Sequence, residues 1–375
     1  MIPVISRWIA ETPGTISLGQ GIVSYGPPRE VVDAAQRFGV TTDEHGYGPI
    51  EGEPELVEAI ERKLARENGI AVRPRSCVIV TAGCNLAFVH AMLALLDTGD
   101  EVILIAPYYF NHEMAVQMIG GRVVAVPATP DYQIDLEAIR AAIAPRTRAV
   151  VTVSPNNPTG AVYDEASLRA LNALCAERGV FHVHDETYEY FTYGSAAHFS
   201  PGSIDGASAH TISLYSFSKA FGMAGWRVGY LVAPAALEDA LGKIQDTSLI
   251  CASIVSQRAA VAALQVGRAH VAPHVHALDR TRRRVHDALS AAGMPCDAPE
   301  ALGAFYYFLR VRTPLDDMTF AERLVREHRV AVVPGSAFGA AGCTVRVSYG
   351  ALDEATVAEG IGRLARGIHA LAAHA

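Results

Sequence analysis

The segment Ser216-Phe217-Ser218-Lys219-Ala220-Phe221-Gly222-Met223-Ala224-Gly225-Trp226-Arg227 follows an apolar run at residues 211–215 that has the composition of a buried strand. It places a lysine directly after two closely spaced serines, Ser216 and Ser218, with an arginine eight positions later. Burial or a nearby cation lowers the pKa of a lysine, and the neutral amine is the form that reacts with carbonyl groups. The segment therefore suits a Schiff-base lysine serving a phosphorylated cofactor. An exposed lysine in a Ser/Gly loop is the simpler interpretation of the segment alone.

Apolar runs of strand length occur on both sides of this segment. They cover residues 77–81, 101–106, 122–126, 148–153, 180–185, 211–215 and 227–232, and helical patterns such as 85–96 and 165–177 separate them. Short continuous apolar runs are typical of strands that are covered on both faces. The sequence therefore predicts an α/β fold, with a mostly parallel seven-stranded sheet between helices.

The rest of the chain predicts a second, smaller domain. Residues 236–290 read as helical, and strands are expected at 304–311, 330–333 and 344–348 before a terminal helix. Residues 1–45 read as an irregular arm leading into a short helix near 30–38, and another helix is expected at 55–67. We expect an N-terminal arm that joins the small domain (1–45), a large domain (46–274) and a small α+β domain (275–375), with a cleft between the domains.

Composition excludes several kinds of partner. The chain has 375 residues, a net charge of -8 and 50% apolar residues, so neither nucleic acid nor an anionic membrane is expected to bind it. Arg7 and Glu11 interrupt the apolar core that a signal peptide needs, and no run is long enough to cross a bilayer. The six cysteines contain no CxxC pair, which fits reduced thiols and a cytoplasmic protein. The absence of a GxGxxG motif after the first strand disfavours an NAD site.

Residues that could bind a ligand or take part in catalysis follow the ends of the predicted strands, where open α/β sheets bind ligands. Gly83-Cys84-Asn85 could present backbone N–H groups to an anion, although an ordinary strand-to-helix turn explains it equally well. Tyr109 follows the second strand and could stack on a planar ring, but a core position is the commoner interpretation.

Three later residues offer polar contacts. Asn157 lies in SPNNPTG, a turn that can hold an amide rigidly, and Asp185 ends an apolar strand, where its carboxylate needs a cationic or hydrogen-bonding partner. Arg346 lies in an alternating strand and is either a carboxylate clamp or part of a surface ion pair. His182 and His184 lack a third ligand at a plausible spacing, so no metal is expected.

The order of these residues resembles that of the class I/II aminotransferases, which are fold type I pyridoxal-phosphate enzymes. The resemblance covers nearly the whole chain and is carried by Tyr47, Gly83, Tyr109, Asn157, Asp185, Tyr188, Lys219, Arg227 and Arg346. The motifs NNPTG, SFSK with the following GWR, and RVSYG are specific for this family when they occur together. The segments PYYFNHEMA, DETYEYFTY and KIQDTSLICASIVSQ look most similar to the subgroup that acts on aromatic amino acids and methionine.

The resemblance implies a role for each residue. Lys219 would bind pyridoxal 5'-phosphate and then move a proton as general base and acid, and Asp185 would keep the cofactor's ring nitrogen protonated. Asn157 and Tyr188 would hydrogen-bond the ring oxygen, and Tyr109 would stack on the ring. The phosphate would be held by Gly83, Cys84, Asn85, Ser216, Ser218 and Arg227. Tyr47 would reach that phosphate from the neighbouring subunit of a homodimer with shared active sites.

The resemblance also implies the substrate contacts. Arg346 would grip the α-carboxylate with help from Asn157 and the Gly21 backbone. We see no second arginine for a side-chain carboxylate, and we expect the apolar pocket to be lined by Ile22, Tyr25, Tyr108, Tyr109 and Ile250. Tyr109 and the Cys84-Asn85 pair depart from the common family pattern, and His112 stands near a position where many relatives have tyrosine.

The expected reaction is a ping-pong conversion of an L-amino acid, aromatic or methionine-like, to its 2-oxo acid through pyridoxamine phosphate. A carbon–sulfur β-lyase on the same fold is the first alternative, because the motifs are common to both reactions. A non-catalytic pyridoxal-phosphate sensor is a remote alternative, since no basic winged-helix segment precedes the arm and every chemical position is filled.

Overall fold

The computed structural model describes residues 2–291 and 293–372, and its largest element is a seven-stranded sheet in the order β2-β8-β7-β6-β5-β3-β4. Only β8 runs antiparallel to its two neighbours, and all other pairs are parallel. The predicted mostly parallel sheet is therefore confirmed. Its strands are β2 (Ser76–Thr81), β3 (Glu101–Ala106), β4 (Arg122–Pro127), β5 (Thr147–Val153), β6 (Phe181–Asp185), β7 (Thr211–Ser216) and β8 (Gly229–Pro234).

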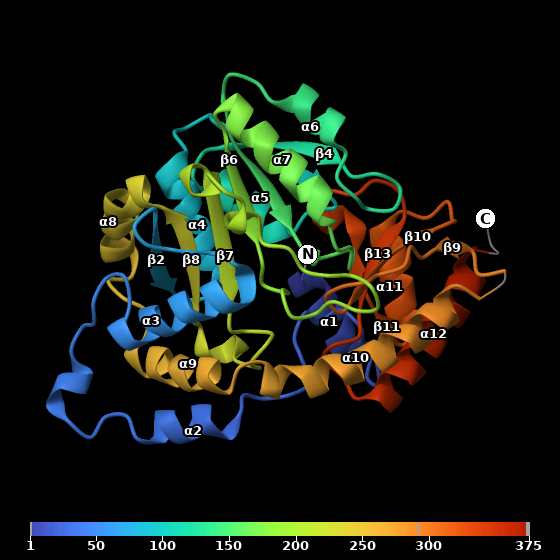
Figure 1. Cartoon of the computed structure of the whole chain (residues 1–375). Helices are drawn as coiled ribbons and strands as arrows, with labels where there is room; N and C mark the ends of the chain where they lie inside the picture. The colour runs from blue at the N-terminus through green and yellow to red at the C-terminus, as the bar shows by residue number, and fades with distance from the viewer. Residues whose placement is uncertain (1, 292, 373–375) are drawn as a thin grey trace.

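Helices cover both faces of the sheet (Figure 1). Successive side chains of a strand point to opposite faces. In β2, Cys77 and Ile79 pack in one apolar cluster with α4, whereas Val78 and Val80 pack in another with α3 and α9. Burial on both faces explains why the strands read as continuous apolar runs. One layer contains α4 (Cys84–Leu95), α5 (Phe110–Met118) and α8 (Glu238–Ser248); the other contains α3 (Pro54–Lys63), α6 (Leu136–Ala142), α7 (Glu165–Arg178) and α9 (Ile254–Val266).

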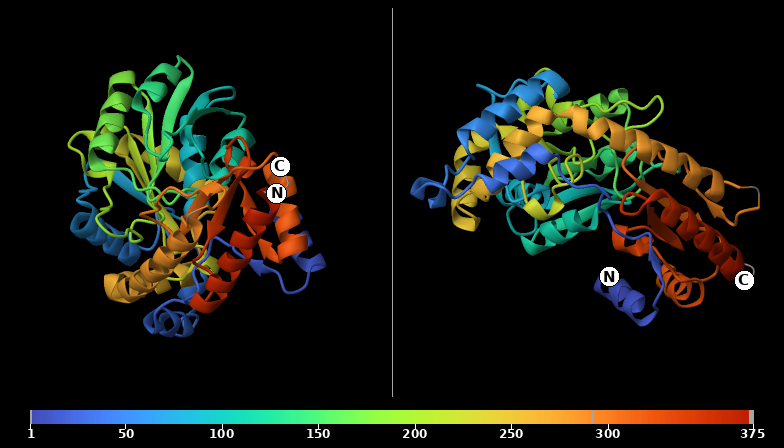
Figure 2. Two further views of the ribbon diagram at one scale, coloured as in Figure 1. Left: turned by 90° about the vertical axis from the view of Figure 1, so that its right-hand side faces the viewer. Right: turned by 90° about the horizontal axis from the view of Figure 1, so that it is seen from below.

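The C-terminal part forms a smaller α+β unit beside the sheet (Figure 2). Four antiparallel strands lie in the order β12-β13-β10-β9, and a separate parallel pair joins β1 to β11. The strands are β1 (Ile16–Ser17), β9 (Cys296–Asp297), β10 (Tyr306–Val311), β11 (Val330–Ala331), β12 (Val333–Pro334) and β13 (Thr344–Ser348). The helices are α10 (Arg268–Leu289), α11 (Asp317–His328) and α12 (Glu354–Ala372).

Two expected elements differ in the structure. The N-terminal arm is not irregular throughout, because residues Ile2–Glu11 form helix α1, which packs against α11 with Ile5 and Trp8 buried. The single strand expected at 330–333 is two strands in different sheets, since β11 pairs with β1 and β12 pairs with β13. The helix near 30–38 is α2 (Arg29–Gln36), and the helix at 55–67 is α3 followed by a π-helical turn at Leu64–Asn68.

The domain boundaries stay predictions. Pairing of β1 with β11 joins the N-terminal arm to the small unit, as expected, whereas α2 packs against α9 of the large one. Helix α10 runs without a break across the boundary placed between residues 274 and 275. Within the described residues, no helix combines the length and the apolarity that a membrane crossing requires.

Candidate active site

A cavity of about 290 Å³ opens where the carboxyl ends of the parallel strands meet strands β10 and β13. This is the edge at which open α/β sheets bind ligands. The antiparallel strand β8 begins at the same edge, which brings Arg227 to the cavity. Of the predicted site residues, the lining includes Gly21, Cys84, Asn85, Tyr109, Asn157, Asp185, Tyr188, Ser216, Ser218, Lys219, Arg227 and Arg346.

Lys219 lies just beyond β7 and points into the cavity. Its Nζ donates a hydrogen bond to the Gly21 carbonyl oxygen over 2.6 Å. Burial, together with the positive charges of Arg346 and Arg227, lowers the pKa of Lys219 to about 8. The amine is therefore far more often neutral at physiological pH than an exposed lysine, as carbonyl chemistry requires.

This pKa predicts how the cofactor-free protein reacts with a carbonyl probe such as salicylaldehyde. The rate is expected to rise about tenfold per pH unit up to about pH 8 and then to level off, because only the neutral amine attacks. The absorbance of the imine, followed over time at each pH from 6 to 10, measures this rate. The chain has only two other lysines, Lys63 and Lys243, so the Lys219→Ala variant gives the background. A rate that keeps rising to pH 10 contradicts the lowered pKa.

Asp185 ends β6 with its carboxylate at the cavity wall. It accepts hydrogen bonds from the Thr187 backbone N–H (2.9 Å) and the Cys84 thiol (3.7 Å), and His112 Nε2 lies 3.3 Å away. Burial raises the pKa of Asp185, but His112 and Thr187 outweigh burial and hold this pKa below its ordinary value. The side chain is therefore a buried anion that faces the cavity. His112 does not line the cavity, so it acts on Asp185 and not on substrate.

The turn between β2 and α4 makes an anion seat. Gly83 caps helix α4 at a φ of 87°, and Cys84 and Asn85, in the first turn of the helix, line the cavity, where a helix N-terminus suits an anion. A Cβ at position 83 would lie 2.9 Å from Arg227 Cζ, so only glycine lets the guanidinium approach this closely. Arg227 is fixed by hydrogen bonds to the carbonyl oxygens of Ala224 and Ala82. An anion of phosphate size fits this arrangement.

Arg346, in the middle of β13, lies on the opposite side of the cavity. Its Nη1 donates to Asn157 Oδ1 (2.9 Å) and its Nη2 to the Gly19 carbonyl oxygen (2.7 Å). Its Nε is buried and has no hydrogen-bond partner among the described residues. A guanidinium that lines a cavity and has only uncharged hydrogen-bond partners among the described residues suits a carboxylate ligand.

Some expected residues lie outside the cavity. Gly83 supports its wall without lining it, and Tyr47 is 83% exposed and apart from it. Of the expected apolar side chains, Tyr109 lines this cavity, whereas Ile22, Tyr25, Tyr108 and Ile250 do not. The Tyr25 hydroxyl instead donates to the Lys219 carbonyl oxygen over 2.9 Å.

Sequence reasoning missed the actual apolar lining, which comes from Ile2, Phe110, Val153 and Tyr306. For Ile2 a signal was present, since Ile2, Ile5, Trp8 and Ile9 follow a helical spacing. No such signal marks Tyr306 within its apolar run, because the register of β10 on β13 decides its neighbours.

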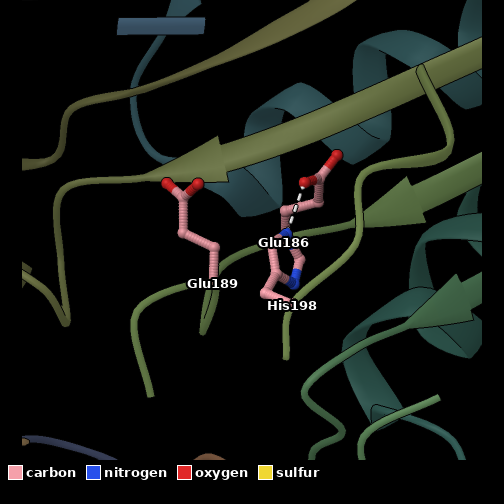
Figure 3. A group of neighbouring side chains, drawn as sticks. All are labelled: Glu186, Glu189 and His198. Atoms are coloured by element: carbon pink, nitrogen blue, oxygen red, sulfur yellow. Dashed lines mark hydrogen bonds and ion pairs between the residues drawn. The ribbon is translucent and has the colours of Figure 1, made fainter. Parts of the chain in front are cut away.

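A second polar cluster begins at Glu186, directly after the end of β6, and is drawn in Figure 3. Ligand-type atoms of Glu186, Glu189 and His198 lie within 4.8 Å of one another. The Glu189 carboxylate forms an ion pair with Lys63 and accepts a hydrogen bond from Asn68. The Glu186 carboxylate accepts a hydrogen bond from Tyr215 and lies beside His198. Because Lys63 supplies the positive charge, the cluster is an ion-pair network in which a metal would face an ammonium group.

The two strand histidines belong to the same buried region. His182 Nε2 and His184 Nδ1 lie 2.7 and 2.6 Å from Thr152 Oγ1. Burial lowers the pKa of His184 to about 4, so this ring is neutral at physiological pH. The absence of a metal stays a prediction.

Comparison with known proteins decides the family. Residues 13–364 match the family described as aminotransferase class I and II. The chain belongs to this family. An aromatic aminotransferase from Arabidopsis thaliana, ISS1, is 36% identical over 99% of this chain and 94% of its own. An aspartate/prephenate aminotransferase from Thermus thermophilus is 38% identical, covering 94% of this chain and 90% of its own.

Solved structures agree with the sequence relatives. An aromatic aminotransferase from Pyrococcus horikoshii OT3 matches this aminotransferase with a TM-score of 0.89 and 34% identity, covering 98% of this chain and 99% of the other. The predicted family, fold class, reaction class and cofactor are thereby confirmed. This aminotransferase is a pyridoxal-phosphate-dependent enzyme that acts on amino acids and 2-oxo acids.

The cavity fits pyridoxal phosphate on its own chemistry. The anion seat at Gly83 and Arg227 suits the phosphate, and the low-pKa amine of Lys219 suits the aldehyde. The Asp185 carboxylate offers a partner to a protonated ring nitrogen. Each charged group that faces the cavity therefore has a counterpart on the cofactor or on an amino acid carboxylate.

Proposed function

We propose that this aminotransferase acts on an aromatic or methionine-like L-amino acid and its 2-oxo acid. When bound, pyridoxal phosphate supplies the electron sink that makes the substrate Cα proton acidic. Lys219 moves that proton between the substrate Cα and C4′ of the cofactor, and Asp185 holds a proton at the ring nitrogen. Asn157 and Tyr188 donate hydrogen bonds to the ring oxygen, and Tyr109 covers the ring.

Arg346 binds the α-carboxylate of the substrate, together with Asn157 and the Gly21 backbone. The backbone at Gly83, Cys84 and Asn85 would hold the phosphate of the cofactor, together with the side chains of Ser216, Ser218 and Arg227. The hydrogen bond from the Ser218 N–H to Ser216 Oγ (3.1 Å) and the position of both serines at the cavity support this placement.

The proposed kind of substrate side chain follows from the charges of the residues that line the cavity. In the described part of the chain, the lysines and arginines that line the cavity are Lys219, Arg227 and Arg346, and each already has a role. None remains for a second carboxylate, such as that of aspartate. The uncharged wall contributed by Ile2, Phe110, Val153 and Tyr306 suits an apolar side chain. The name of the Arabidopsis relative agrees with this substrate class, whereas the Thermus relative is named for aspartate and prephenate.

A half-reaction screen tests the substrate class. Holoenzyme is mixed with single amino acids, loss of the cofactor's visible absorbance is followed, and the matching 2-oxo acid is assayed. We expect phenylalanine, tyrosine, tryptophan or methionine to react with a kcat/KM at least about tenfold above that of aspartate, because an unpaired side-chain carboxylate is costly to bury. A preference for aspartate or glutamate contradicts the apolar assignment, and release of pyruvate and ammonia from cysteine conjugates identifies the lyase.

The homodimer and the cytoplasmic location also stay proposals. The segment between α2 and α3, which carries the exposed Tyr47, projects from the body of the subunit (Figure 1), so its hydroxyl is free to reach a neighbouring site. A sedimentation measurement that gives a monomer at assay concentrations contradicts the shared site. The six cysteines are free thiols, which agrees with a reducing compartment.

A further inference from the structure

Tyr306 stands between two residues of the proposed site. It begins strand β10, is fully buried and lines the cavity. Its neighbours are Arg346 on β13 and Tyr188, which follows β6 in the large sheet. One side chain therefore connects the strand that presents the proposed carboxylate ligand to the segment that faces the cofactor.

The ring of Tyr306 supports the Arg346 guanidinium. Arg346 Cζ lies 4.7 Å from the centroid of the Tyr306 ring and 5.1 Å from that of Phe338. The two aromatic rings attract the cation, and the attraction is stronger where water is excluded. With Nη1 on Asn157 and Nη2 on Gly19, the rings fix the plane of the guanidinium, so that its unpaired Nε keeps one direction.

The hydroxyl of Tyr306 lies 2.6 Å from the hydroxyl of Tyr188, and their rings meet edge to face at 5.6 Å. A hydroxyl has one hydrogen, so only one of the two can donate in this pair. When Tyr306 donates, the hydrogen of Tyr188 is free to point into the cavity. Gly21 leaves room for the Tyr306 hydroxyl, since a Cβ at position 21 would lie 2.9 Å from the hydroxyl oxygen.

We propose that Tyr306 is a positioning residue with two separable effects: its ring orients Arg346 for the substrate carboxylate, and its hydroxyl donates to Tyr188 and directs the Tyr188 hydrogen toward the ring oxygen of the cofactor. The proposal rests on the roles proposed above for Arg346 and Tyr188. It goes beyond them because it assigns carboxylate orientation and cofactor electronics to a residue that the proposed function places only in the apolar wall.

The experiment uses holoenzyme variants and two readouts. The first is the Kd of 3-phenylpropionate, a carboxylate without an amine that binds but does not react. The second is the pH midpoint of the absorbance change of the bound cofactor. Tyr306→Phe keeps the ring and removes the hydroxyl, whereas Tyr306→Met fills similar space without an aromatic face.

Tyr306→Phe is expected to leave the Kd within about twofold and to raise the pH midpoint by about 0.5 to 1 unit, because the ring oxygen anion loses an oriented donor. Tyr306→Met is expected to raise the midpoint equally and to weaken 3-phenylpropionate binding about 10- to 30-fold. Tyr307→Phe is the matched control, since Tyr307 is the next residue of β10, is equally buried and donates its hydroxyl hydrogen to the Arg282 carbonyl oxygen, 3.5 Å away, instead of to Tyr188. It should move neither readout.

Arg346→Ala separates failure of this inference from failure of the proposed function. If Arg346→Ala weakens 3-phenylpropionate binding and Tyr306→Met does not, the ring of Tyr306 has no positioning effect. An unchanged midpoint in Tyr306→Phe overturns the role of the hydroxyl. If Arg346→Ala itself binds normally, the carboxylate assignment is wrong. Circular dichroism checks folding, and Tyr306→Leu replaces Tyr306→Met if the methionine variant does not fold.

Discussion

Replacing Lys219 with alanine is expected to lower the turnover number by at least about 10⁴-fold while the cofactor still binds. In the described part of the chain, Lys219 is the only lysine at the cavity and no histidine lines it. Arg227 and Arg346 already donate hydrogen bonds to oxygen atoms of the chain, and a guanidinium offers donors but no acceptor. Without Lys219, the described lining keeps no lysine or histidine to move the proton between the substrate Cα and C4′ of the cofactor.

Stopped-flow measurement of the half-reaction with phenylalanine gives the decrease in rate directly. Absorbance after gel filtration shows whether the protein retains the cofactor. The anion seat, Asp185 and Asn157 are untouched by the change, so retention is expected. Lys243→Ala is the control, because Lys243 is exposed on α8 and lies outside the cavity lining. Near-normal turnover in Lys219→Ala would remove the central assignment of this site.

Replacing Asp185 with asparagine is expected to slow the half-reaction by about 10²- to 10³-fold. Asparagine keeps the size and one acceptor oxygen of the side chain, so the hydrogen bond from the Thr187 N–H can remain. The change removes the negative charge that favours a proton on the ring nitrogen. Without that proton, the cofactor withdraws electrons from Cα less strongly. Because the pKa of Asp185 is held below its ordinary value, the carboxylate is already ionised at neutral pH, where the comparison is made.

A second readout distinguishes this effect from simple unfolding. The absorbance spectrum of the bound cofactor is expected to change in Asp185→Asn, because the protonation state of its ring changes. Asp100→Asn is the control: Asp100 is also buried and ion-paired, with Arg148 at 2.9 Å, but it precedes β3 at the opposite edge of the sheet. If Asp185→Asn reacts at the normal rate with a normal spectrum, the ring nitrogen has another partner.

Much of the large domain could be read from local patterns. Strands such as Ser76–Thr81 and Thr147–Val153 are continuous apolar runs because each is covered on both faces. The parallel arrangement then brings residues that follow different strands to one edge, which is why Gly83, Asn157 and Lys219 could be grouped from sequence. The family resemblance supplied their roles, which the geometry accommodates and the variants above test.

Sequence by itself determined the strands of the large sheet, the order of the chemical residues and the family, because these depend on composition and on short spacings. The tertiary structure decided which residues meet across long separations. Tyr306 reaches Tyr188 and Arg346 only through the register of β10 on β13 and the docking of that sheet beside the large one. His112 meets Asp185, and Ile2 meets the cavity, for the same reason. Such contacts depend on how separate elements pack, and no local pattern of residues encodes that packing.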